Sequence, residues 1–451
     1  MTEALIYALV AYLVILLGIA YIASNKLETE EDFLVGGRKF NLWLTTFCLF
    51  ATWFGAGTLI AASDEVAANG LKVTALEPYG AGLCLIFTGM FFAKPLWNMK
   101  IMTYGDLFKN KFGDKVELVS VILNIPIYVG WIAVQLVALA NVLSVFFPAP
   151  QFLLIVLIAL FTTLLTVMGG MWSVSLTDSF QMFIIILGLV YLFFNVIGGA
   201  VDGFQSLLAQ VSAEKLVLIP TEKLGDLFSW LGVLSISALG NMTGQDLGQR
   251  VFSARSSKTA QMGCYISGVG YIVVGSIPVF LGLTAPHALG TSFEGSVIPN
   301  LIKSYLDPFT GLILVLTIFS AVISTITSAL LSPSSLISHN YLKKHFPNTS
   351  TLTLSKLAVV FVAALSVLTA FAGENIYTLL ENSYAIGLVG FFVPVTIALF
   401  SNKLSEKACL ITIAFGISVW IPEFFGYENL PYTLVSVLLS YPVYFISYKY
   451  I

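Results

Sequence analysis

Long apolar stretches recur along the whole chain, and they constrain the fold more than any other feature. A helix that crosses a bilayer needs about 20 predominantly apolar residues. Stretches of this kind occur at 4–23, 44–64, 74–96, 118–145, 152–171, 177–200, 227–249, 262–284, 308–338, 355–373, 377–400, 407–423 and 431–449. Only 10% of the residues are charged, against about 25% in soluble domains. The sequence therefore predicts an all-α polytopic membrane protein with 13 transmembrane helices.

The distribution of basic residues tests this helix count through the positive-inside rule. With the N-terminus outside, the inner loops hold 17 of the 21 lysine and arginine residues. The outer loops hold Lys72, Lys215, Lys223 and Lys303. With an even number of helices, or a helix missed midway, the basic residues would no longer be concentrated on one side of the membrane. We therefore expect the N-terminus outside and the C-terminus inside, in a plasma membrane or a bacterial inner membrane.

Glycines interrupt two of the expected helices at corresponding places. Gly55 and Gly57 lie within the second helix, and Gly244 lies within the seventh, five helices later. Interrupted helices in two halves are typical of transporters built from inverted repeats with the binding site between them. Because the offset is odd, the two halves must have opposite topology. The single domain 1–451 then divides into a peripheral first helix and inner loop at 1–43, inverted repeats at 44–200 and 227–401, and two peripheral helices at 402–451.

Small and hydroxyl residues line one face of the ninth helix, at intervals of three and four. One reading is that these residues let membrane helices pack closely. The other is a site for a hard cation such as sodium, which prefers oxygen ligands. The hydroxyls of Ser324 and Thr325 and the carbonyl of Ala321 would supply three ligands. The carbonyls of Ala51 and Phe54, in the interrupted second helix, would supply two more.

Two carboxylates lie within apolar stretches. Asp246 follows the Gly244 break, and an intramembrane acid is a functional candidate by default. An ion pair with Arg250, four residues on, is the structural alternative. From its position alone, Asp178 would cap a helix or lie as a charge near the membrane interface. Asn241 and Gln245 flank the break and are candidates for binding a polar solute.

Two tryptophans lie deeper in their helices than the interfacial position that is typical of tryptophan. Trp53 is in the interrupted second helix, beside Gly55, and Trp131 is in the fourth helix. Two indoles facing one cavity suit a quaternary ammonium group through cation–π attraction. We therefore assign Trp53, Gly55 and Trp131 to the substrate site, together with Asn241 and Gln245.

Six motifs resemble the sodium:solute symporter family, in the order of that family. They are EDFLVGGRKF (31–40), ATWFGAG (51–57), FFAKP (91–95), VMGGMWSVSLTDSFQ (167–181), GQDLGQRVFSA (244–254) and AVISTITSALLSPSSLISHNYL (321–342). The nearest resemblance is to the choline-transporter branch. It implies a LeuT-like fold and sodium-coupled symport by alternating access.

The resemblance also implies roles for particular residues, among them a role of Asp178 in a second ion site or the inner gate. The principal sodium site of the family maps onto Ala51, Phe54, Ala321, Ser324 and Thr325, which include the residues chosen from the hydroxyl stripe. Tryptophans at the places of Trp53 and Trp131 resemble substrate-cage residues of the choline-transporter branch. A third cage tryptophan is expected in the seventh helix, where this chain has Gly244.

The sequence thus predicts a symporter that imports sodium with a small polar organic solute, which a choline-like cation would fit. An amino acid, a monocarboxylate, a sugar or a vitamin are alternatives on the same fold, and a channel or a sensor is a more distant one. The four cysteines lie in apolar stretches and the three histidines are scattered. We therefore expect no enzyme, no cofactor or transition metal, and no nucleic-acid partner. Sodium, the solute and the lipid bilayer are the expected partners.

Overall fold

The computed structural model describes residues 2–147, 149–200, 209, 211–290, 294–372, 376–427 and 430–450. Its regular elements are α-helices and short 3₁₀- or π-helical segments, the latter labelled η. The first half contains α1 (Thr2–Ser24), α2 (Glu30–Val35), η1 (Gly36–Arg38), α3 (Leu42–Trp53), η2 (Gly57–Ala61), α4 (Ala62–Asn69), η3 (Leu71–Ala75), α5 (Tyr79–Phe87), η4 (Thr88–Phe92), α6 (Ala93–Asn98), α7 (Tyr104–Lys111), α8 (Asp114–Phe146) and α9 (Gln151–Ala200).

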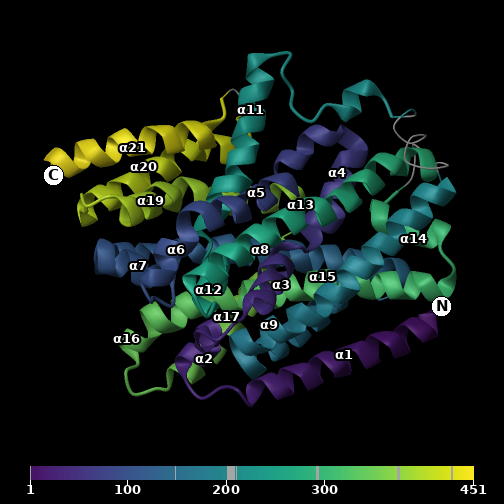
Figure 1. Cartoon of the computed structure of the whole chain (residues 1–451), viewed down its shortest axis with the longest axis horizontal. Helices are drawn as coiled ribbons and strands as arrows, with labels where there is room; N and C mark the ends of the chain where they lie inside the picture. Colours follow the sequence, from purple (N-terminus) through teal and green to yellow (C-terminus); the bar gives the residue numbers. More distant parts are fainter. Residues whose placement is uncertain are drawn as a thin grey trace.

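The second half is also helical. It contains η5 (Ala213–Leu216), α11 (Leu224–Ser235), η6 (Ile236–Gly240), η7 (Asn241–Thr243), α12 (Gln245–Ser253), α13 (Ser257–Ala288), α14 (Val297–Tyr305), α15 (Pro308–Ser335), η8 (Leu336–Leu342), α16 (Lys343–His345), α17 (Thr351–Ala370), α18 (Ile376–Gly387), η9 (Leu388–Phe392), α19 (Val393–Phe400), α20 (Glu406–Phe424) and α21 (Tyr432–Tyr450). Most of the long helices run in roughly the same direction, so that they form one bundle (Figure 1).

Nine helices of the described chain are long and apolar enough to cross a membrane, or up to eleven when each bent pair counts as one span. The two bent pairs are the helices that glycines were predicted to interrupt. Leu42–Trp53 and Gly57–Asn69 meet at 59°, and Leu224–Thr243 and Gln245–Ser253 meet at 49°. The expected breaks are therefore present, whereas the count of 13 stays a prediction.

The stretches 152–171 and 177–200 were expected to be separate helices, and they form the two parts of α9. A turn at Gly170 divides it, with φ of 50° and ψ of −135°. A side chain at this position would meet the backbone oxygen of Phe33, in α2, at 2.6 Å. Glycine is required here both by the positive φ and by the close approach of α2.

α15 lies at the centre of the bundle. In its most apolar 18-residue window 83% of the residues are buried, whereas the corresponding share is 22% for α1 and 33% for α20. α15 packs against α9, α8 and α3. The helix that carries the hydroxyl stripe is therefore enclosed by protein, while the first helix and α20 lie at the periphery.

Candidate functional site

The break in the first bent pair begins where α3 ends, and it has a defined backbone structure. Phe54 leaves the helical region, with φ of −75° and ψ of 70°. The N–H of Ala56, freed by the break, donates to Oε1 of Gln135 at 2.7 Å. Gln135 is buried in α8. A polar side chain from a neighbouring helix thus satisfies the interrupted backbone, as an apolar environment requires.

Gly55 allows α3 to approach α15 closely at this break. A Cβ atom on Gly55 would lie 2.5 Å from Oε1 of Gln135 and 2.5 Å from Oγ1 of Thr325. Neither neighbour can withdraw freely, because one satisfies the backbone of Ala56 and the other is buried in α15. The position therefore needs a residue without a side chain.

Gly55→Ala is expected to destabilise the protein by about 1–3 kcal/mol through overpacking and to weaken sodium activation of uptake, because it separates α3 from α15. Gly18→Ala is the matched control, since a Cβ atom on Gly18 has nothing within 4 Å. Thermal unfolding in detergent and uptake at several sodium concentrations would measure both effects. Equal behaviour of the two variants would contradict the role of Gly55.

Four of the five predicted sodium ligands come together between α3 and α15. The Ser324 hydroxyl lies 3.1 Å from the carbonyl oxygen of Ala51 and 2.8 Å from that of Ala321. The Thr325 hydroxyl lies 3.4 Å and 3.1 Å from the same two oxygens. Phe54 is fully buried at the adjacent break. This cluster of uncharged oxygen atoms suits a hard monovalent cation, although sodium binding here stays a prediction.

Asp178, in α9, is fully buried where that helix faces α3 and α15. Its Oδ2 accepts hydrogen bonds from Cys48 at 3.4 Å and Ser328 at 3.5 Å. Its Oδ1 has no hydrogen-bond partner among the described residues. Asp178 lies within α9 rather than at its start, so that the helix-cap alternative is wrong.

A small cavity lies beside the α3 break, with Trp53 in its wall. It is lined by Trp53, Asn124, Ile127, Tyr128, Trp131, Gly240, Asn241, Thr243, Gly244, Asp246, Ser383, Tyr384, Gly387 and Phe391. Its volume of about 20 Å³ is room for about one water molecule. The cavity therefore has to enlarge before an organic solute can enter.

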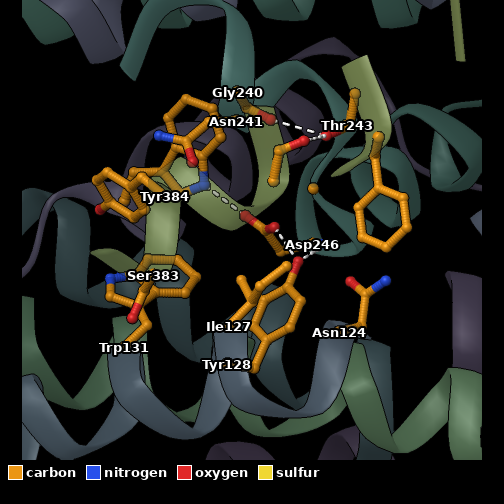
Figure 2. A pocket seen from close by; sticks show the side chains of 14 residues that line it. Asn124, Ile127, Tyr128, Trp131, Gly240, Asn241, Thr243, Asp246, Ser383 and Tyr384 are labelled. Atoms are coloured by element: carbon orange, nitrogen blue, oxygen red, sulfur yellow. Dashed lines mark hydrogen bonds between the residues drawn. The ribbon is translucent and has the colours of Figure 1, made fainter. Parts of the chain in front are cut away.

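Aromatic rings surround much of this cavity. The ring of Trp131 lies 5.9 Å from that of Tyr128 and 6.2 Å from that of Tyr384, between centroids. Figure 2 shows these three side chains around Asp246, with Asn241 nearby. Trp53, Trp131 and Asn241 were predicted to bind the solute, and all three line the cavity.

Asp246 is the charged group of the cavity. Its carboxylate accepts hydrogen bonds from the indole N–H of Trp53 and the hydroxyl of Tyr128. Arg250 donates instead to the backbone carbonyl of Asp246 at 3.2 Å and to the hydroxyl of Ser328 at 2.6 Å. None of the ion pairs among the described residues includes Asp246. The alternative of an Asp246–Arg250 ion pair is therefore wrong.

The structure separates two residues from the cavity that had been assigned to the substrate. Gln245 is fully buried, where its Oε1 accepts from the backbone of Tyr104 at 2.8 Å and its Nε2 donates to Ser335 at 3.0 Å. The amide oxygen and the amide nitrogen of Gln245 thus both form hydrogen bonds to neighbouring helices. Gly55 faces Gln135 and Thr325 rather than the cavity.

Sequence reasoning missed several residues of the site, among them Tyr128, Gln135 and Tyr384. Tyr128 and Gln135 lie on the face of α8 that also carries Trp131, because their spacings are three and four residues. That spacing of polar and aromatic residues in an apolar stretch was the available signal. Tyr384 donates to Glu77 behind the cavity at 3.5 Å, and the same carboxylate accepts from Thr58 at 2.8 Å.

Interrupted helices with binding sites at the interruptions are typical of secondary transporters. The two bent helices of this chain, with an oxygen-lined and an aromatic site at their breaks, place it in that class. The fold is that of a substrate-bound, outward-open sodium-coupled sialic acid symporter, with a TM-score of 0.85 at 18% identity, over 100% of this chain and 98% of that one. A nucleobase-cation-symport-1 family transporter in a closed conformation gives a TM-score of 0.65 at 15% identity, over 92% and 94% of the two chains. The expected LeuT-like architecture is confirmed at this level.

Residues 33–416 match the model of the sodium:solute symporter family, and the chain belongs to that family. The human high affinity choline transporter 1 is 28% identical over 98% of this chain and 80% of its own length. The symporter YidK of Escherichia coli is 24% identical over 92% and 78%. The human sodium-coupled monocarboxylate transporter 1 is 22% identical over 90% and 70%. The chain is therefore a multi-pass membrane protein and a sodium-coupled symporter of a small solute.

Proposed function

We propose that the solute is a small organic cation of the choline type, and that Asp246 balances its charge. The observation that carries this proposal is a buried carboxylate, held by two neutral donors, in a cavity with five aromatic side chains. A charge within a membrane protein is costly unless it is paired. An organic cation would pair with Asp246 and attract the rings of Trp53, Trp131 and Tyr384 by cation–π interaction.

The glycine at position 244, where the resemblance leads us to expect a third cage tryptophan, is compatible with this assignment. A Cβ atom on Gly244 would lie 2.6 Å from Oδ1 of Asp246 and 3.5 Å from the hydroxyl of Tyr128. A large side chain at position 244 is therefore incompatible with the present position of the carboxylate. In this chain a negative charge and the ring of Tyr128 occupy the side of the cavity that faces Gly244.

An anionic solute is disfavoured by the same geometry. Neither lysine, arginine nor histidine is among the residues that line the cavity, and Asp246 would repel a carboxylate. A neutral polar solute is the second candidate, because Asn124, Asn241 and Ser383 offer amide and hydroxyl groups at the cavity wall. Uptake of an organic cation would need the negative charge of Asp246, whereas uptake of a neutral polar solute would not.

We propose that sodium and solute are coupled through three neighbouring residues of the α3 break. Sodium would bind the carbonyls of Ala51 and Phe54, together with Ala321, Ser324 and Thr325, and so hold α3 against α15. Trp53, between the two carbonyls, contacts Asp246 in the cavity. Sodium would therefore keep Trp53 in the position that the solute needs. Because coupling between sites is reciprocal, the solute would raise the affinity for sodium equally.

The topology predicted from the sequence remains part of this proposal. The start of α1 and the end of α21 lie at opposite ends of the bundle, which supports an odd number of crossings (Figure 1). Division of α9 at Gly170 and addition of α21 to the eleven spans would make 13. Alternating access would then involve the inverted repeats 44–200 and 227–401, with 1–43 and 402–451 at the periphery.

Asp178 is proposed to act as a second sodium ligand or as part of the inner gate. Its free Oδ1, the hydroxyl of Ser328 and the nearby cluster around Ser324 support an ion close to the principal site. Asp178→Asn is expected to lower the cooperativity of sodium activation while leaving the solute concentration for half-maximal uptake unchanged. Initial rates at varied sodium would measure this, with Asp226→Asn in exposed α11 as control. Unchanged cooperativity with slower turnover would favour the gate.

Uptake into proteoliposomes tests the proposed function directly. The panel would contain choline and betaines, amino acids, sugars, monocarboxylates and pantothenate-like vitamins. We expect saturable uptake of an organic cation that requires an inward sodium gradient and is inhibited by other quaternary ammonium compounds. Uptake that ignores the sodium gradient would contradict coupling. Selective uptake of a neutral or anionic compound would contradict the assigned substrate class.

A further inference from the structure

A large apolar groove lies on the outside of the bundle, apart from the transport site. It is lined by α8, η8 and α17, and its volume is about 620 Å³. Leu118 and Ile122 of α8, Tyr341 of η8, and Leu357 and Phe361 of α17 are among its lining residues. Ligand pockets in proteins have volumes of about 300–1,000 Å³. The groove is therefore large enough for a molecule, and its lining suits one that is predominantly apolar.

Each of the three elements that line the groove has lysine residues at the same end. Lys115 precedes Leu118 and Ile122 by three and seven residues, so that all three share one face of α8. Lys343 and Lys344 directly follow η8, and Lys356 directly precedes Leu357. This is the end of the bundle where α7 and α16 lie (Figure 1).

The acidic residues at this end already have basic or polar partners. Glu117 pairs with Lys344, and Asp114 pairs with Lys344 at 3.3 Å and with Lys109 at 3.8 Å. Asp106 pairs with His339 at 3.2 Å. Although burial alone would raise the pKa of Asp106, the hydrogen bonds and charge of His339 hold it below the usual value.

Three lysines at this end take part in no such ion pair among the described residues. Lys343 donates to the carbonyls of Pro347 and Thr349, both at 3.0 Å. Lys115 and Lys356 take part in none of the ion pairs among the described residues. Glu406 accepts the backbone N–H of Lys115 at 3.1 Å. Lysine side chains outside the ion pairs thus lie at the end of the elements that line an apolar groove.

We propose that this groove binds an anionic phospholipid, with an acyl chain against α8, η8 and α17 and the headgroup phosphate at Lys115 and Lys356. Apolar lining and a basic mouth are complementary to the two parts of such a lipid. Basic clusters between membrane helices, at the cytoplasmic side, are known to favour anionic headgroups. The positive-inside distribution expected from the sequence puts these lysines on that side.

Binding at this groove would act on the helix that carries the hydroxyl stripe. η8 directly continues α15, which contains Ser324 and Thr325. The hydroxyl of Ser355, in α17, donates to that of Ser338, in η8, at 2.9 Å. A lipid in the groove would therefore brace the end of α15 against α8 and α17. Lipid retention can be measured without transport, so failure of this inference is distinguishable from failure of the proposed function.

The test uses the full chain reconstituted with equal amounts of phosphatidylcholine and phosphatidylglycerol, then extracted in mild detergent. Mass spectrometry of the copurified lipid should show enrichment of phosphatidylglycerol. Lys115→Gln and Lys356→Gln are each expected to weaken its retention by about fivefold. Lys258→Gln, at the start of α13, is the matched control because α13 does not line the groove.

A second variant tests the apolar part of the site. Ile122→Trp should fill the groove. It should reduce both the amount of copurified lipid and the enrichment of phosphatidylglycerol. Val269→Trp, on α13, is its control, since Ile122 and Val269 are similarly exposed, at 54% and 56%. Thermal unfolding would verify that every variant is folded. Equal retention of the two lipids by the unaltered chain, or full enrichment in the lysine variants, would overturn the proposal.

Discussion

Asp246→Asn is expected to reduce the efficiency of cation uptake by roughly 100-fold, because removing one partner of a buried charge pair costs about 3 kcal/mol or more. The substitution preserves the size of the side chain, and the amide oxygen can still accept one hydrogen bond from Trp53 or Tyr128. The change is therefore directed at the negative charge. Initial uptake rates at several solute concentrations would show the loss, chiefly as a higher concentration for half-maximal uptake.

Two controls separate this charge effect from damage to the fold. Asp226→Asn removes an exposed acid from α11, which belongs to the same bent pair, and should leave uptake unchanged. Thermal unfolding of Asp246→Asn should resemble that of the unaltered protein. If the variant transports as efficiently as the unaltered chain, the solute does not need a counter-charge. The neutral polar solute would then be the better assignment.

Ser324→Ala and Thr325→Ala are each expected to raise the sodium concentration for half-maximal uptake by about tenfold, since a hydrogen-bond-type contact to a charge contributes about 1.5–3 kcal/mol. The double variant should lose sodium activation within the practical range of concentrations. The two hydroxyls lie within 3.4 Å of the carbonyls of Ala51 and Ala321, so that they and the carbonyls can face the same ion.

Ser334→Ala provides a matched control on the same helix. Ser334 is buried as Ser324 is, but its hydroxyl donates to the carbonyl of Leu330 at 2.6 Å, away from the α3 break. It should keep normal sodium activation. Sodium activation that is unchanged in the Ser324→Ala, Thr325→Ala double variant would contradict the proposed ion site. It would leave the separate prediction for Asp246 intact.

Local sequence patterns were sufficient for the helices and for their interruptions. Apolar length identifies spans, and the glycines at 55, 57 and 244 weaken the helices that contain them. Both interrupted helices are bent in the structure, at 59° and 49°. The hydroxyl stripe of α15 was also readable, because spacings of three and four residues define one face of a helix. These features depend on neighbours along the chain.

The spacing of Asp246 and Arg250 shows where such local reasoning fails. Four residues apart on a helix, they have the spacing of an ion pair. Instead, Trp53 and Tyr128, from two other helices, donate hydrogen bonds to the carboxylate of Asp246. Arg250 donates to the hydroxyl of Ser328 in α15. The hydrogen-bond partners of Asp246 and Arg250 therefore depend on the bend at Gly244 and on the helices packed around it.

The sequence by itself determined the class of protein and the two interrupted helices, and it identified the oxygen-bearing residues around Ala51 and Ser324 that the fold brings together. Those properties follow from hydrophobic length, helical period and the chemistry of oxygen ligands. Only the tertiary structure decided that Gln135 satisfies the break, that Tyr128 and Tyr384 complete the cavity, and that Gln245 lies outside it. The reason is that rotation of each helix about its axis is set by packing against its neighbours, which no single stretch of sequence specifies.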